Sequence, residues 1–258
     1  MRLRARDGQI MGVMTPSSAT AARAMAVRRR GRRVEDAFGL VLLLVLSTYV
    51  VASLTPFRGW GGVCITALCS LSVVTAFISA RARPRVIVWG GRIAAVAILV
   101  SVVGAVTGER AVFGIAAIVE SLLLTRASLS VLGAVLTEQR VGFRTILGAV
   151  SVYVTLGLLF AFAYVAVDRL QDQPFFGPDA QLQAGDFLFF SVTTLTTTGY
   201  GNLVPAGQPG KLLAALEMLM GQILLVTLIA RLVSMWQPGE WVRDEAGLVA
   251  QRREGEAP

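Results

Sequence analysis

The sequence predicts an all-α integral membrane protein, and two observations support this fold class. Hydrophobic residues make up 55% of the 258 residues and charged residues only 16%, a balance too apolar for a soluble domain of this length. The apolar residues also fall into runs close to the ~20 residues that a helix needs to cross a bilayer. Lipid is therefore the expected solvent for most of the chain.

Six apolar runs are long enough to be read as membrane spans. Those before residue 145 predict a four-helix transmembrane domain over 34–144, and the last two bound a second domain over 145–236. Their ranges are 34–54, 60–80, 86–107, 111–136, 145–167 and 212–236.

The arginines of the connections predict the orientation of the chain. Six crossings place both termini on one side, and the connections on that side carry Arg81, Arg83, Arg85, Arg140 and Arg144. The opposite connections are less basic, so the positive-inside rule places both termini in the cytoplasm.

The two ends of the sequence are predicted to be cytoplasmic tails. Residues 1–33 contain nine Arg and no apolar periodicity, which predicts a basic disordered tail, and residues 237–258 form a short charged one. A signal peptide is the competing interpretation, but the run 37–54 is long for one and has no clear cleavage site. With 23 Arg and one Lys, the composition hints at a bacterial plasma membrane.

Several function classes are excluded by composition. The chain has no His, and Cys64 and Cys69 are five residues apart, on different faces of one predicted helix. Zinc, haem and iron–sulfur sites lack ligands, so we expect no cofactor and no enzyme. The net charge of +8 comes from arginines beside apolar runs, which favours membrane lipid over nucleic acid as a partner.

The segment between the last two spans is too short to cross a bilayer. Residues 185–195 are apolar for about ten residues, the length of a re-entrant half-helix, and Asp186 is placed to be its N-cap. A polar, Thr-rich stretch follows. Non-helical backbone at membrane depth is tolerated only where it is buried in protein or lines a water-filled cavity, so this stretch predicts a pore.

The run Thr196-Thr197-Thr198-Gly199-Tyr200-Gly201-Asn202 carries the strongest motif of the chain. It resembles the selectivity filter of potassium channels, as do the flanking residues 189–195 and 203–205. A strand that ends in a turn is the alternative for the short motif alone, and its membrane context argues against it. The likeness covers the pore module; the first four spans agree with six-span channels only in number.

The resemblance implies roles for the residues of this run. The Thr197 hydroxyl and the carbonyls of Thr197, Thr198, Gly199 and Tyr200 would bind K+, with glycines at 199 and 201 supplying positive φ. Tyr200 would point away from the axis and brace the loop against the half-helix. Two residues depart from the family pattern: Thr198 stands where Val is usual, and Asn202, at the filter mouth, stands where Asp is usual. Strict K+ selectivity depends on how these two residues are accommodated.

The last span resembles a pore-lining inner helix. Gly221 lies near its middle, where it would act either as a gating hinge or as a site of close helix packing. Glu217 would either hydrogen-bond behind the filter or extend toward the outer interface. Both pairs of alternatives stay open at this stage.

The fourth span does not have the charges of a voltage sensor. It carries one arginine, Arg126, with Glu120 on another face, and one charge crossing the membrane gains only ~2.3 kcal/mol per 100 mV. We expect these two residues and Arg92 to be held in structural ion pairs.

Together these features predict a potassium-selective channel that conducts K+ passively. Each chain offers one filter strand, and a K+ site needs rings of four, so the expected assembly is a homotetramer. A weakly selective monovalent cation channel and a non-conducting channel-like subunit are the alternatives.

Overall fold

The computed structural model describes residues 38–55, 59–137, 143–177 and 184–235. The predicted tails at 1–33 and 237–258 lie outside these residues, as do residues 34–37 of the first predicted span and Arg140. The described part is all helical, which confirms the predicted fold class.

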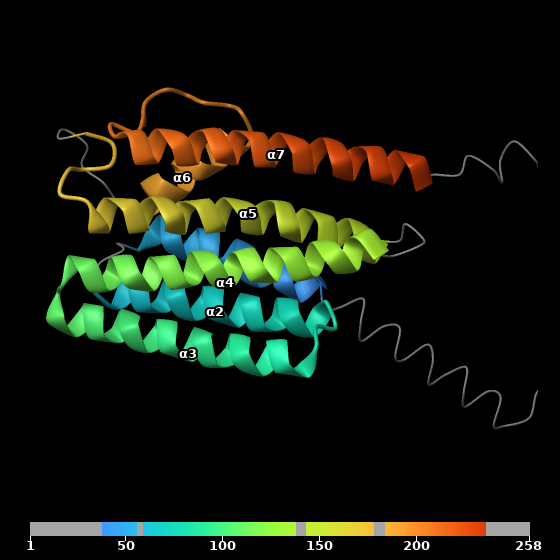
Figure 1. Ribbon diagram of the computed structural model, residues 1–258, viewed down its shortest axis with the longest axis horizontal. Coiled ribbons are helices and arrows are strands. Elements are labelled where there is room, and N and C mark those ends of the chain that lie inside the picture. The colour runs from blue at the N-terminus through green and yellow to red at the C-terminus, as the bar shows by residue number, and fades with distance from the viewer. Residues whose placement is uncertain (1–37, 56–58, 138–142, 178–183, 236–258) are drawn as a thin grey trace, which may run out of the picture.

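The first described helix covers Phe38–Leu54. It is followed by helices whose bounds are α2 Trp60–Ser79, α3 Pro84–Thr107, α4 Arg110–Thr137, α5 Phe143–Leu170, α6 Ala184–Leu195 and α7 Gln208–Met235. The long helices α2–α5 and α7 run side by side and nearly parallel, and the short α6 lies between α5 and α7 (Figure 1).

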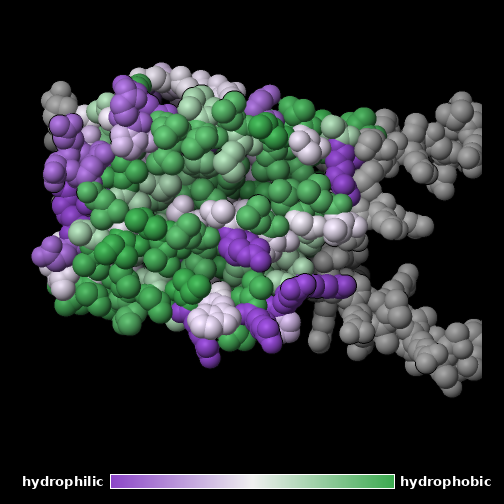
Figure 2. All heavy atoms as spheres, viewed as in Figure 1, coloured by the Kyte–Doolittle hydropathy of each residue, from purple (hydrophilic) through white to green (hydrophobic). Residues whose placement is uncertain are grey.

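Five of these helices are long and apolar enough to cross a membrane, and they match five predicted spans. The described part of the first predicted span, Phe38–Leu54, is shorter than the others. Figure 2 shows the apolar surface along the helices, with hydrophilic residues gathered at one end of the molecule and in places over the α3 and α4 side. The protein is therefore a multi-pass membrane protein.

Helix α5 lies at the centre of the arrangement. It packs along α4 on one side, and on the other it contacts α6 and α7 (Figure 1). Among the labelled helices, α7 contacts only α5 and α6, and α2, α3 and α4 contact one another. Large apolar side chains of α7, such as Leu219, Ile223 and Val233, are more than 60% exposed. A face of this kind must meet lipid or another protein chain.

The first helix contacts α5 and α6, which come much later in the sequence. The Tyr49 hydroxyl donates to the Val154 carbonyl of α5 at 2.9 Å, and the Ser151 hydroxyl lies 3.4 Å from the Phe38 carbonyl. A Cβ on Gly185, in the first turn of α6, would lie 3.3 Å from the Ser53 Cα. The first turn of α6 thus packs against the first helix.

Candidate functional site

Helix α6 is a half-helix that ends inside the molecule. Its 12 residues span about 18 Å, well short of the ~30 Å hydrocarbon core. It begins at Ala184, so Asp186 lies inside the first turn and the expectation that Asp186 is the N-cap is wrong. A carboxylate in the first turn still interacts favourably with the helix dipole. The loop that follows runs beside α6 and α7, away from α2–α4 (Figure 1).

The backbone of this loop alternates between two conformations. Thr197, Gly199 and Gly201 have φ values of 57°, 51° and 79°, whereas the residues between them do not have positive φ. Positive φ was expected at the two glycines and is found there. For the β-branched Thr197 it is a strained conformation, of the kind that concentrates at functional sites.

The amides at the start of the loop are tied to the end of α6. The amides of Thr198 and Gly199 both donate to the Thr193 carbonyl, at 2.8 and 3.1 Å, and the Thr197 amide donates to the Thr194 carbonyl at 3.0 Å. In a trans peptide unit the carbonyl points opposite to the amide hydrogen. The carbonyls of Thr197 and Thr198 therefore point away from α6, toward the exposed side of the loop.

Side chains of the loop make two further contacts. The hydroxyls of Thr196 and Thr198 are 2.9 Å apart, so the extra hydroxyl that Thr198 introduces has a local partner. The Tyr200 ring stacks on Phe189 of α6 at a centroid distance of 5.8 Å and an interplanar angle of 8°. The expected contact of Tyr200 with the half-helix is therefore present. Asn202 is exposed.

Glu217 of α7 connects this helix to α5 and α6. It is fully buried, and its carboxyl accepts a hydrogen bond of 2.5 Å from the Tyr164 hydroxyl of α5. Its other oxygen lies 2.5 Å from the Ser191 hydroxyl of α6, and the same hydroxyl lies 2.7 Å from the Gly157 carbonyl. The Glu217 carboxyl is therefore held by hydrogen bonds inside the molecule and does not extend toward the outer interface, and its support of the filter stays a prediction.

The half-helix, the alternating loop and the buried Glu217 of α7 lie in one contiguous segment, and a family comparison covers the same segment. Residues 150–237 match the ion channel family model. The matched segment starts in α5 and includes α6, the loop and α7. No curated protein and no solved structure matches the chain. The match supports an ion-channel family for this segment, which is not an enzyme class.

The ion-channel domain also contains an aromatic cluster that sequence reasoning missed. Tyr164 is fully buried at its centre, with ring centroids 5.2 Å from Phe175 and 5.0 Å from Phe190. Phe176 joins these rings from the loop after α5, at 5.1 Å from Phe190. The recurring Phe pairs at 175–176 and 189–190 were the available signal. The cluster packs around Tyr164, which in turn donates its hydrogen bond to Glu217.

Gly221 of the ion-channel domain lies where α7 crosses the end of α6. A Cβ at this position would come within 2.9 Å of the Leu195 carbonyl and 2.6 Å of its Cδ1 atom. The same carbonyl accepts a hydrogen bond of 3.2 Å from the Tyr153 hydroxyl. This contact favours the packing role for Gly221; α7 is continuous through it, and the hinge role stays a prediction.

Asp168, near the end of α5, is a buried acidic residue that is only 5% exposed. Its carboxylate accepts a hydrogen bond of 3.2 Å from the Phe175 amide and pairs with Arg169 at 3.6 Å. Asp168 thus anchors the start of the linker, whereas Asp172 is exposed and Asp179 lies outside the described residues.

Charged groups outside the ion-channel domain do not form the expected ion pairs. The Glu120 carboxyl accepts a hydrogen bond of 2.6 Å from the Ser70 hydroxyl, and Arg126 lies 3.3 Å from the Ser130 hydroxyl. Arg92 lies over the Trp89 ring at 5.4 Å. Within the part of the chain that the structure describes, neither arginine has a carboxylate partner. The expectation failed because a hydroxyl and an aromatic face can also stabilise these groups.

Proposed function

We propose that the protein is a potassium-selective channel of the plasma membrane, in which four copies of the loop 196–202 surround one axis. The observation that carries this proposal is the alternating backbone of the loop, with φ positive at Thr197, Gly199 and Gly201. Alternation turns successive carbonyls toward one side, which is what a cation needs when it gives up its water.

The environment of the loop supports the same function. The amides of Thr197, Thr198 and Gly199 donate to carbonyls of α6, so the first carbonyls of the loop are left for an ion. The carboxyl end of α6 carries about half a negative charge, and four copies would stabilise a cation at the centre of the membrane. The K+ ligands would be the carbonyls of Thr197, Thr198, Gly199 and Tyr200, together with the Thr197 hydroxyl.

The exposed side of the loop and of α7 supports a homotetramer. Tyr200 is 70% exposed in the single chain, and apolar side chains of α7 face outward over most of its length. Since one chain contributes a single loop, rings of ligands require further copies. In this assembly both termini are cytoplasmic, six helices cross the membrane, and the loop opens on the outer side.

Ion flux into liposomes tests the proposal. We expect purified protein to support K+ and Rb+ flux that Ba2+ blocks, with much slower Na+ flux. Gly199→Ala introduces strain of ~1–2 kcal/mol in each subunit and should reduce the flux about tenfold or more. Gly108→Ala is the matched control, because Gly108 also has positive φ, 71°, and also has open space at its Cβ position, but caps α3.

The outcomes separate the proposal from its alternatives. Equal Na+ and K+ flux would refute K+ selectivity and leave a monovalent cation channel. No flux from correctly assembled protein would favour a non-conducting subunit. Equal loss of flux in Gly199→Ala and Gly108→Ala would show that general strain, and not the loop, was responsible.

A further inference from the structure

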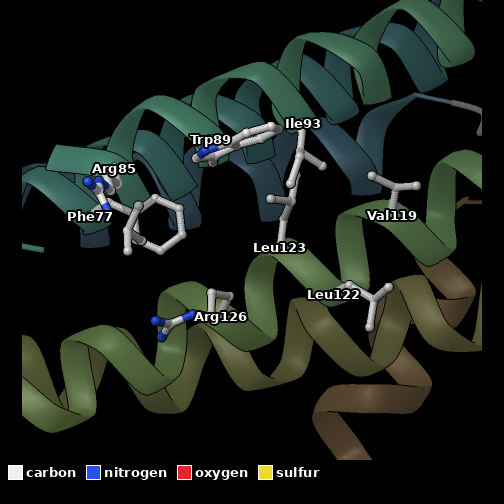
Figure 3. A pocket seen from close by; sticks show the side chains of 10 residues that line it. Phe77, Arg85, Trp89, Ile93, Val119, Leu122, Leu123 and Arg126 are labelled. Carbon is white, nitrogen blue, oxygen red and sulfur yellow. The ribbon is translucent and has the colours of Figure 1, made fainter. Parts of the chain in front are cut away.

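A cavity of about 440 Å³ lies between α2, α3 and α4, apart from the channel loop. Its walls are apolar and come mainly from α3 and α4, with Phe77 of α2 between them (Figure 3). Two arginines also line it, Arg85 and Arg126, and Figure 3 shows both toward one end, opposite Val119. The cavity therefore has a cationic end and a long hydrophobic remainder.

The cationic end lies toward the membrane surface at which α3 begins and α4 ends. Arg85 is one residue after Pro84, the start of α3, and Arg126 lies 11 residues before the end of α4 at Thr137, or about 16 Å along the helix. Trp89, which also lines the cavity, is of the residue type that gathers at the membrane interface. In the orientation proposed above, this surface is the cytoplasmic one.

The charge of the two arginines is not balanced by a carboxylate of the residues that the structure describes. Both side chains are exposed, and among the described residues no carboxylate pairs with either of them. An arginine at membrane depth is costly unless it finds an anionic partner or reaches the interface. Since α2–α4 lie across α5 from α7, the cavity would face lipid at the edge of the assembly and not the pore (Figure 1).

We infer that this cavity binds an anionic phospholipid of the cytoplasmic leaflet. The phosphate lies between the guanidinium groups of Arg85 and Arg126, and an acyl chain follows the apolar wall formed by Trp89, Ile93 and Leu123. Two cations against one phosphate favour a lipid with a net negative charge over a zwitterionic one, whose headgroup carries its own cation. The site depends on the membrane orientation and not on ion conduction.

Fluorescence of Trp89 tests the site directly. In full-length protein with Trp60, Trp236 and Trp241 changed to Phe, Trp89 is the remaining tryptophan. The protein is reconstituted into bilayers with increasing fractions of brominated phosphatidylglycerol or brominated phosphatidylcholine, which quench a neighbouring ring. We expect brominated phosphatidylglycerol to quench Trp89 at a lower lipid fraction than brominated phosphatidylcholine. Each arginine that contacts the phosphate should raise the affinity for phosphatidylglycerol over phosphatidylcholine about fivefold.

Arginine variants provide the control. Arg126→Gln and Arg85→Gln should each reduce the preference for phosphatidylglycerol, and Arg126→Lys should retain most of it. Arg83→Gln is the matched control, because Arg83 is exposed just before α3 but does not line the cavity. Equal quenching by the two lipids, or a preference that survives Arg85→Gln and Arg126→Gln, would overturn the inference. If Arg126→Gln does not assemble, Arg85→Gln alone decides.

Discussion

Replacement of Glu217 tests whether the buried brace works through hydrogen bonds or through charge. The Ser191 hydroxyl has one hydrogen and lies within 2.7 Å of both the Glu217 carboxyl and the Gly157 carbonyl. In Glu217→Gln, the amide can accept from Tyr164 and donate to Ser191, which leaves the Ser191 hydrogen for Gly157. Every polar group stays paired, so we expect this variant to match the wild type in stability and K+ flux.

Glu217→Ala has a different expected outcome. The Tyr164 hydroxyl, which is fully buried, loses its acceptor at a cost of about 1–3 kcal/mol, and the vacated space adds a penalty of similar size. We expect a loss of about 2–5 kcal/mol per subunit in the free energy of unfolding. Chemical unfolding of the purified protein followed by circular dichroism measures this loss, and liposome flux reports its effect on the loop.

Two further variants complete the test. Tyr164→Phe in the Glu217→Ala background removes the unpaired hydroxyl and should recover about 1–3 kcal/mol. Glu109→Ala removes an exposed carboxylate between α3 and α4 and should change stability by less than about 0.5 kcal/mol. A Glu217→Gln variant as damaged as Glu217→Ala would refute the hydrogen-bond argument and show that the charge itself is required.

Two other substitutions address the channel loop. Gly221→Ala should displace the end of α6, because the added Cβ meets the Leu195 carbonyl, and we expect K+ flux to fall severalfold. Gly133→Ala is the control: Gly133 lies in α4 with open space at its Cβ position, so flux should be unchanged. Unchanged flux in Gly221→Ala would contradict the packing role. Thr198→Val removes the contact between the hydroxyls of Thr196 and Thr198. The Thr196 hydroxyl keeps its hydrogen bond to the Val192 carbonyl, so the loss in the free energy of unfolding should stay near 0.5–1.5 kcal/mol, roughly one hydrogen bond. Conduction with at least wild-type K+ over Na+ selectivity is expected from reversal potentials, and loss of selectivity would show that the Thr198 hydroxyl is required.

Features that depend on local sequence were predicted well. Five of the long apolar runs correctly predicted membrane-length helices, and the short run before the Thr-rich stretch correctly predicted α6. Positive φ at Gly199 and Gly201 follows from the lack of a side chain, a property of each residue by itself. The same reasoning could not predict the positive φ of Thr197, because that conformation is imposed by hydrogen bonds between neighbouring amides and α6.

Features that depend on the register between helices were not predictable. The partners of Glu217 lie 53 and 26 residues away in sequence, on two other helices. Burial of Asp168 depends on how the linker folds back to place the Phe175 amide against it. In the same way, the sequence shows an arginine at position 126, but only the packing of α3 beside α4 shows that it lines a cavity with Arg85.

The position of the first helix has a consequence for the order in which the molecule is assembled. Tyr49 is bonded to a residue 105 positions later in the sequence, and the Ala52–Ser53 backbone lies against Gly185. The helix Phe38–Leu54 is synthesised before α5 and α6 and therefore completes these contacts only after both have been made. Contacts of such long range form late and slowly. A fragment that starts at α5 would lack this surface, so the half-helix should dock correctly only when the helix Phe38–Leu54 is present.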